Sequence, residues 1–193
     1  MFYIVGLGNP GDKYINTRHN VGRMVLEEMS DNSLIKDKPS NASIASMSLG
    51  GEVIQLFAPE TFMNNSGETV KYIVSKLGAV TEDVIVVHDD IDLPFGEVKV
   101  AKGRGAGGNN GVESIIKQLK SKNFVRVRVG IAPKSFWTGK VKRPAGGGPL
   151  ERFVLKPFAS SERKDLPMVL AKAKEAIELV VSSGVEVAMN KIN

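Results

Sequence analysis

The order of short apolar runs and amphipathic segments constrains the fold of this chain more than any other feature. Residues 2–7 and 84–87 are short runs rich in apolar residues, which is typical of strands buried on both faces. Elsewhere, apolar residues recur every three or four positions, which indicates helices with one buried face. Strands that alternate with helices predict an α/β domain.

The remaining elements follow from the same periodicities. Strands are predicted at residues 43–49, 52–58, 97–101, 124–131 and 153–155. Helices are predicted from Asn20 as cap, from about Ser66 to Gly78, over residues 112–119, and from about Asp165 to Gly184. Gly50-Gly51 predicts a hairpin, which argues against a purely parallel sheet. Residues 134–150 are predicted to be a mobile loop.

Length and composition limit the class of protein. A chain of 193 residues is expected to form one domain, residues 1–193, with ample material for a core. No apolar run approaches the roughly 18 residues of a membrane span, and the N-terminus begins without a basic leader region. The absence of cysteine excludes disulfides and a thiol nucleophile, and is consistent with a cytoplasmic protein.

Positive charge is concentrated in one part of the sequence. Residues 99–156 contain fourteen Lys and Arg against two acids, a net charge of +12, whereas the rest of the chain carries −7. A solvated basic surface is the simplest explanation. Because the charges are interleaved with glycine-rich loops, the pattern favours a phosphate-rich partner, with nucleic acid ahead of an acidic small molecule.

The chain has only two histidines, and each lies in a polar cluster. His19 follows the first predicted strand and its glycine loop, and His88 follows the buried run at residues 84–87. A lone histidine is commonly structural, but a group that titrates near neutrality beyond a strand end favours proton transfer. A carboxylate at the end of the second strand could be its partner. No good nucleophile accompanies them, which suggests a water activated by histidine.

Several other kinds of chemistry are disfavoured. Residues 6–11 match the dinucleotide fingerprint G-x-G-x-x-G, but Pro10 and further turn-like residues precede the next helix, so a nicotinamide cofactor is rejected. Asp89, Asp90 and Asp92 could bind a cation, yet neither histidine has a partner at metal-ligand spacing, and no metal is expected. Ser66 lacks the nucleophile elbow of serine hydrolases.

Two polar loops remain open to more than one interpretation. The amides of residues 62–67 could cap a helix or hydrogen-bond a substrate carbonyl or ribose. The glycine-rich loop at residues 103–111 could form an anion cradle before a helix or could be a plain flexible loop.

Five motifs, taken together, strongly resemble bacterial-type peptidyl-tRNA hydrolases. They are GLGNPG at residues 6–11, TRHNVG at 17–22 preceded by Tyr14, FMNNSG at 62–67, HDDIDLP at 88–94 and GGNNG at 107–111. The resemblance runs in order over most of the chain. It implies a single α/β domain of the phosphorylase/hydrolase-like kind, with a central mixed, mostly parallel twisted sheet flanked by helices. It also implies a monomer without cofactor.

The resemblance implies roles at matching positions. His19 would activate water against the ester between peptide and tRNA, and Asp89 would orient its imidazole. Asn9 would distinguish peptidyl-tRNA from free aminoacyl-tRNA. Residues expected to bind substrate or tRNA are Tyr14, Phe62, Asn64, Asn110, Lys102, Arg104 and Arg128. The activity would release tRNA from peptidyl-tRNA that leaves ribosomes prematurely.

Two positions depart from the family pattern. Asn109 stands where the family commonly has histidine, so the contact of that position with the acceptor end of tRNA is not implied. The segment 140–152 is longer than usual and has no implied role. The alternative function is a non-catalytic RNA-binding protein on the same fold, although phosphate binding alone needs none of the proposed site residues.

Overall fold

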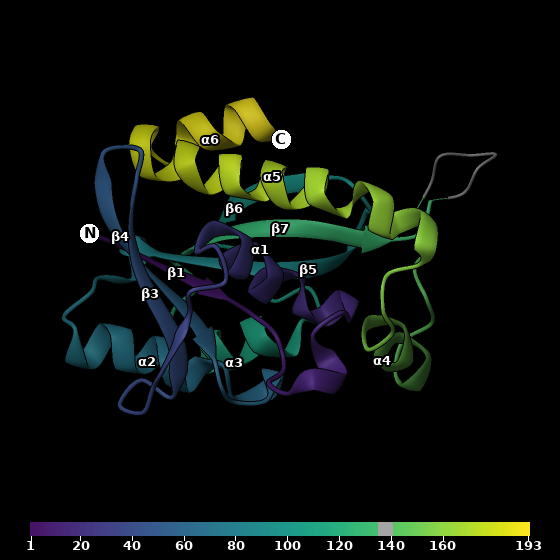
Figure 1. Ribbon diagram of the computed structural model, residues 1–193, viewed down its shortest axis with the longest axis horizontal. Helices are drawn as coiled ribbons and strands as arrows, with labels where there is room; N and C mark the ends of the chain where they lie inside the picture. Colours follow the sequence, from purple (N-terminus) through teal and green to yellow (C-terminus); the bar gives the residue numbers. More distant parts are fainter. Residues whose placement is uncertain (135–140) are drawn as a thin grey trace.

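A computed structural model describes residues 1–134 and 141–193 (Figure 1). The strands of the described residues form one sheet of seven, in the order β2-β3-β4-β1-β5-β7-β6. The strands are β1 (Phe2–Gly6), β2 (Ile35–Asp37), β3 (Ala42–Leu49), β4 (Glu52–Pro59), β5 (Val84–Pro94), β6 (Val98–Lys102) and β7 (Val125–Ala132). The helices are α1 (Val21–Met29), α2 (Gly67–Lys76), α3 (Asn110–Leu119), α4 (Gly148–Val154), α5 (Ser160–Ser183) and α6 (Val185–Ile192).

The sheet is mixed, as the sequence predicts. β4, β1, β5 and β7 pair in parallel, and β2, β3 and β6 are added in antiparallel fashion at the two sides. The expectation of a mixed, mostly parallel sheet flanked by helices is therefore confirmed. The Gly50-Gly51 hairpin is confirmed, because it joins β3 to β4 directly.

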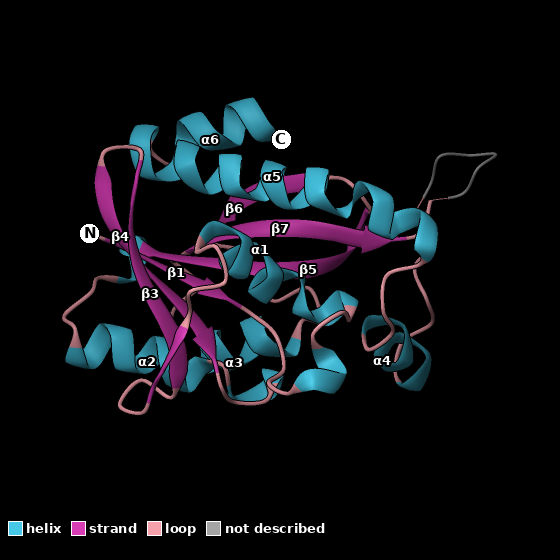
Figure 2. Cartoon of the chain, in the orientation of Figure 1, coloured by secondary structure: helices cyan, strands magenta, loops and turns pink. Residues whose placement is uncertain are grey.

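Helices cover both faces of the sheet, which explains the apolar runs in the central strands (Figure 2). Ile85 and Val87 of β5 pack with α1 and α5 on one face, whereas Val84 and Val86 pack with α2 and α3 on the other. Successive side chains of a strand point to opposite faces, so a strand covered on both sides is apolar throughout.

One close contact holds α1 against the sheet. A Cβ atom placed on Gly22 would lie 2.2 Å from the carbonyl oxygen of Val87 and 2.7 Å from the main-chain nitrogen of Leu7. Only glycine permits this approach. The contact places the residues just before α1 directly over the end of β5.

The predicted helices and strands are largely confirmed, with three corrections. β5 extends beyond residues 84–87 and includes the acidic cluster, with a register shift between Asp90 and Pro94. The acidic cluster is thus part of a strand, because β7 pairs with His88, Asp89 and Asp90 before the register shift. Residues 153–155 form no strand, since Phe153 and Val154 end helix α4 and Leu155 follows it.

The third correction concerns the start of α5, which begins at Ser160 rather than near Asp165. The first turn has no apolar periodicity, so a pattern of buried residues cannot reveal it. The Glu162 carboxylate accepts a hydrogen bond from the main-chain N–H of Ala159 at 2.6 Å, which stabilises that first turn. Of the loop predicted at residues 134–150, residues 135–140 lie outside the described part of the chain.

Substituting Gly22 tests whether this contact controls the fold. We expect Gly22→Ala to lower the free energy of unfolding by about 1–3 kcal/mol, because the added methyl group meets main-chain atoms that cannot rotate away. Chemical denaturation monitored by circular dichroism measures the change. Gly146→Ala is the matched control, since its Cβ would meet no atom within 4 Å and its expected effect is below about 0.5 kcal/mol. Equal stability of the two variants would contradict the role of Gly22.

Candidate active site

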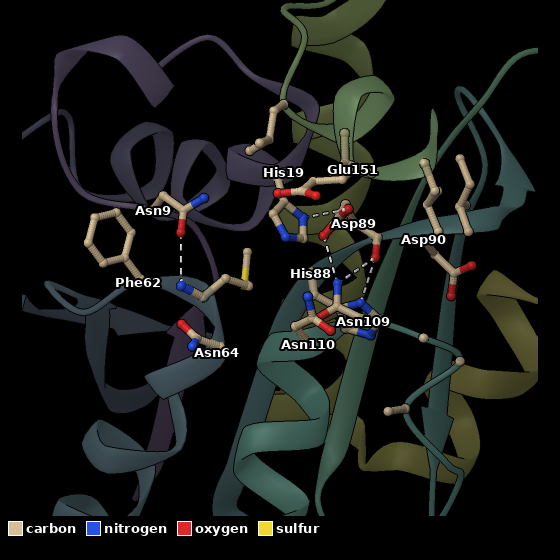
Figure 3. Close-up of a pocket in the computed structure, with 18 of the residues that line it drawn as sticks. Asn9, His19, Phe62, Asn64, His88, Asp89, Asp90, Asn109, Asn110 and Glu151 are labelled. Atoms are coloured by element: carbon tan, nitrogen blue, oxygen red, sulfur yellow. Dashed lines mark hydrogen bonds and ion pairs between the residues drawn. The ribbon is translucent and has the colours of Figure 1, made fainter. Parts of the chain in front are cut away.

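A pocket of about 660 Å³ lies at the carboxyl ends of β1, β4 and β5 (Figure 3). Ligand sites of open α/β sheets lie at this edge, where loops from neighbouring parallel strands converge. The pocket brings together seven of the ten predicted site residues. They are Asn9, Tyr14, His19, Phe62, Asn64, Asp89 and Asn110.

His19 and Asp89 form the central pair of the pocket. His19 Nδ1 lies 2.9 Å from Asp89 Oδ2, and the two residues are only 8% and 4% exposed. Along β5, Asp89 shares the face of Val87, against which α1 packs, and His19 lies in the 3-10 turn just before α1. The alternation of the strand therefore directs Asp89, and not His88, toward His19.

The pair fixes the chemical form of His19. A carboxylate only accepts hydrogen bonds, so Nδ1 carries the proton and Nε2 of the neutral ring keeps its lone pair. In Figure 3 this second nitrogen faces the open space bounded by Asn9, Asn64 and Asn110. Burial disfavours the charged ring, but the charge and hydrogen bond of Asp89 outweigh it and raise the pKa of His19 above its ordinary value.

His88 has a different environment. Its Nδ1 donates to the main-chain oxygen of Asp89 at 2.7 Å, and its Nε2 is buried and has no hydrogen-bond partner among residues 1–134 and 141–193. Burial lowers the pKa of His88, and the nearby Asp89 and Asp90 do not restore it. His88 is therefore held neutral, which makes His19 the histidine suited to proton transfer near neutral pH.

Asn9 is held rigidly at the opposite wall. Its Oδ1 accepts the main-chain N–H of Met63 at 2.8 Å, so the amide nitrogen faces the pocket. Asn20 was predicted as the cap of α1, but its side chain makes no capping bond. Instead Asn20 accepts from the main-chain N–H of Asn9 and donates to the Asn9 carbonyl, both at 2.9 Å. It thus fixes the glycine loop against α1.

The other predicted substrate residues are accessible. Tyr14 and Phe62 form an edge-to-face pair with ring centroids 6.4 Å apart, and Phe62 is 57% exposed. Asn64 lies in the 3-10 turn before α2, and Asn110 is the first residue of α3; both are exposed. Ser66, in contrast, is buried outside the pocket and donates to the carbonyl of Met63. It is not placed to act as a nucleophile.

Sequence reasoning missed the role of Asn109. Its side chain caps α3 and also donates to Asp89 Oδ1 at 2.8 Å. In the sequence, its position just before the predicted helix at residues 112–119 could have indicated the capping role. The cap also argues against an anion cradle at the start of α3. The main-chain N–H groups of Gly111 and Val112, which such a cradle would use, already donate to the Asn109 side chain.

Helix α4 supplies a wall of the pocket that the sequence did not predict. Leu150, Glu151 and Val154 line the pocket, and in Figure 3 Glu151 enters from the side opposite Asn110. Pro149 lies in the first turn of this helix, where proline is favoured, and could have indicated the helix in the sequence.

Arg18 connects this region to the His19 turn. Its guanidinium pairs with Glu162 at 2.5 Å and donates to the carbonyl of Pro157 at 2.8 Å. It also lies over the ring of Phe153, 4.5 Å from the centroid. Since Arg18 directly precedes His19, these contacts fix the turn that carries the imidazole.

The predicted basic contacts lie outside the pocket wall. Lys102 directly precedes the glycine-rich loop and Arg104 lies within it, and neither forms an ion pair with any acid in the described part of the chain. Arg128 pairs with Asp90 at 2.7 Å. Arg126, two residues before Arg128 on β7, is 3% exposed and donates to the Gly105 carbonyl at 2.9 Å. Arg126 therefore supports the loop rather than facing solvent.

The acidic cluster is divided among different partners. Asp89 contacts His19, Asp90 pairs with Arg128, and Asp92 pairs with Arg143. Across residues 1–134 and 141–193, no group of three or more His, Asp or Glu side chains is arranged to hold a metal ion. Within the same residues, no helix is long and apolar enough to span a bilayer.

The glycine loop after β1 also agrees with the sequence argument. Two 3-10 turns, Asp12–Tyr14 and Arg18–Asn20, intervene before α1 begins at Val21. No helix starts within the glycines, as a dinucleotide site requires. Together with the buried histidine–carboxylate pair and the asparagine amides around it, this arrangement on an α/β fold is typical of a hydrolytic site rather than of a nucleotide-cofactor site.

Comparison with known proteins gives the particular family. The model of the peptidyl-tRNA hydrolase family matches residues 3–193. Peptidyl-tRNA hydrolase of Nocardia farcinica is 38% identical over 98% of this chain and 95% of its own length, and that of Herpetosiphon aurantiacus is 41% identical over 100% and 90%. The crystal structure of peptidyl-tRNA hydrolase from Acinetobacter baumannii superposes with a TM-score of 0.88 at 30% identity, covering 100% of this chain and 94% of the other.

The chain therefore belongs to the peptidyl-tRNA hydrolase family. Membership makes it an enzyme that hydrolyses peptidyl-tRNA, and the resemblance found in the sequence is confirmed.

The two histidines should titrate in opposite directions. We expect NMR titration to give His19 a pKa above the ordinary histidine value of about 6.5. The His88 ring should stay neutral at the pH values where His19 takes up its proton. Asp89→Asn removes the charge that opposes burial, so the pKa of His19 should fall below its value in the wild type. The spectrum of His19→Ala assigns the signals. A wild-type His19 that titrates below the ordinary value would contradict this assignment of charges.

Proposed function

We propose that His19 acts as the general base that removes a proton from water as it attacks the ester between peptide and tRNA. The observation that carries this proposal is the Nδ1 contact with Asp89, which leaves Nε2 as an acceptor facing the pocket. Asp89 stabilises the imidazolium formed in the step and keeps the ring in one orientation. The base then returns the proton to the departing ribose oxygen. The mechanism needs no metal ion or other cofactor.

Asn9 supplies selectivity in this proposal. Its amide oxygen is engaged by Met63, so its NH2 group is available to the acyl part of the substrate. A peptide offers this donor an amide carbonyl, whereas a free aminoacyl group offers an ammonium ion. A buried donor left without an acceptor costs about 1–3 kcal/mol. Asn9 therefore favours peptidyl-tRNA over aminoacyl-tRNA.

The exposed residues of the pocket hold the substrate beside the base. Asn64 and Asn110 can hydrogen-bond the groups around the scissile ester from two different helical segments. Tyr14 and Phe62 form an aromatic surface at the rim that can pack against the acyl chain or the terminal base. These contacts place the ester within reach of the activated water.

The body of the tRNA is bound by the basic segment in this proposal. Lys102 and Arg104 lie at the start of the glycine-rich loop, next to the residues that lead into Asn110. Lys102 is the last residue of β6, and Arg128 lies on the neighbouring strand β7, where it pairs with Lys99. In this proposal Lys102, Arg104 and Arg128 supply the positive charge that contacts the phosphates of the tRNA body.

We further propose that the whole chain, residues 1–193, works as one monomeric domain in the cytoplasm. Its substrate would be peptidyl-tRNA released prematurely from ribosomes, and the reaction would return tRNA for reuse. The two products are made and used where translation occurs, which supports this location.

The alternative is an RNA-binding protein without catalysis. Phosphate binding requires only basic groups, whereas this pocket aligns a histidine, a carboxylate and three asparagines. Burying a carboxylate is costly unless it is paired, and in this pocket the partner of Asp89 is the histidine itself. The geometry of the pocket therefore supports hydrolysis over binding alone.

Hydrolysis of N-acetyl-aminoacyl-tRNA tests the proposal directly. We expect the wild-type protein to cleave this substrate, and His19→Ala to lower kcat by about 10²–10⁴-fold, the usual contribution of a general base. The affinity for tRNA should stay within about twofold, because His19 contacts no phosphate in this proposal. Release of the labelled N-acetyl-amino acid measures the rate.

Three controls accompany this assay. Circular dichroism confirms that the variant is folded, a chelator should leave the wild-type rate unchanged, and unblocked aminoacyl-tRNA should be a poor substrate. Binding of tRNA without cleavage by the wild type would support the RNA-binding alternative instead. Cleavage by His19→Ala at the wild-type rate would remove His19 from the mechanism.

The tRNA contacts can be tested by the salt dependence of binding. Each phosphate contact contributes a slope of roughly −0.9 in log affinity against log salt concentration. Lys102→Ala, Arg104→Ala and Arg128→Ala should each weaken tRNA binding and reduce the slope by about one unit. Filter binding at several salt concentrations measures both quantities.

Lys76→Ala provides the matched control for these variants. Lys76 is exposed at the last turn of α2, about 15 Å along the helix from the pocket end. Its replacement should leave the slope unchanged. A slope equal to that of the wild type in all three test variants would place the tRNA footprint on another surface.

A further inference from the structure

We propose that Asn109 is a positioning residue that holds the Asp89 carboxylate in the orientation required by His19. This inference rests on the function proposed above, and it assigns a role to a position where the chain departs from the usual histidine of the family. The carrying observation is a hydrogen bond from Asn109 Nδ2 to Asp89 Oδ1 at 2.8 Å.

Both polar atoms of the Asn109 side-chain amide form hydrogen bonds. Its Oδ1 accepts the main-chain N–H groups of Gly111 at 3.0 Å and Val112 at 3.1 Å. Its Nδ2 donates to Asp89 Oδ1 and lies 3.3 Å from the Asp89 main-chain oxygen. Because two N–H donors can meet only the oxygen, the orientation of the amide is determined, and the NH2 group must face Asp89.

The two oxygens of the Asp89 carboxylate thereby have separate partners. Oδ2 contacts the imidazole of His19, and Oδ1 contacts Asn109 (Figure 3). Asp89 is almost fully buried, so water does not replace either contact. A carboxylate held at both oxygens cannot rotate about its terminal bond without losing a charge-assisted hydrogen bond.

The contact also links three parts of the site. Asn109 caps α3, and the next residue, Asn110, is a proposed substrate ligand at the pocket wall. Movement of α3 would therefore disturb Asp89 and Asn110 together. A neutral imidazole cannot reproduce this arrangement, because its single acceptor nitrogen has one lone pair for two main-chain donors. The role belongs to the asparagine of this chain.

Two substitutions separate the positioning role from the capping role. Asn109→Ser and Asn109→Asp both retain a side-chain oxygen that can cap α3, but neither has the NH2 group. For Asn109→Ser we expect kcat to fall about tenfold, the size of one hydrogen bond to a charged group, with KM within about twofold. Denaturation curves and circular dichroism confirm that each variant is folded.

The pH dependence of kcat/KM gives a readout that a cap alone would not move. The fall of kcat/KM at low pH, its acid limb, reports protonation of His19. Asn109→Ser leaves the Asp89 carboxylate loosely held, so Asp89 raises the pKa of His19 less. The acid limb should therefore move to lower pH. Asn109→Asp adds a second negative charge next to Asp89, so the acid limb should move to higher pH. Opposite shifts in two variants with similar caps would support positioning.

A double-mutant cycle completes the test. If Asn109 acts through Asp89, then Asn109→Ser should change kcat by less than about twofold in the Asp89→Asn background. Additive losses, or wild-type kcat and pH profile in both single variants, would overturn the inference. Failure of the wild type to cleave N-acetyl-aminoacyl-tRNA would instead overturn the proposed function, so the two failures are distinguishable.

Discussion

The packing of α1 against β5 controls the geometry of the whole site. Gly22 lies so close to Val87 that any side chain would meet main-chain atoms. His19 precedes Gly22 by three residues, and Asp89 follows Val87 by two, so this single approach brings the two catalytic candidates within 2.9 Å. Arg18 holds the same turn from the other side through Glu162. The imidazole is thus positioned by main-chain packing and by an ion pair, both independent of substrate.

Hydrogen bonds to asparagine perform most of the local positioning around this pair. Asn20 fixes the main chain of Asn9, Met63 fixes the Asn9 amide, and Asn109 fixes the Asp89 carboxylate. An amide can donate and accept at once without carrying charge, which suits it to a buried network. The NH2 group of Asn9 faces the pocket, where the proposed function uses it.

Positive charge is divided between structural and accessible groups. Arg126 supports the glycine-rich loop from inside, and Arg128 pairs with Asp90. Lys102 and Arg104 form no ion pair within residues 1–134 and 141–193. Counting charges along the sequence therefore overstates the surface available to a polyanion, because burial and pairing depend on which strands become neighbours.

The sequence by itself determined most of the strands and helices, the hairpin at Gly50-Gly51 and the motifs that identify His19 and Asp89, because these depend on periodicity and on residue type. It did not reveal β2, α4 or α6. It did not determine that the acidic cluster lies within β5, that residues 153–154 end a helix, or that α5 starts at Ser160. Tertiary structure alone decided these features and the partners of Asn20, Arg126 and Asn109. Each depends on a contact between distant segments, and local propensity carries no information about which donor will find which acceptor across the fold.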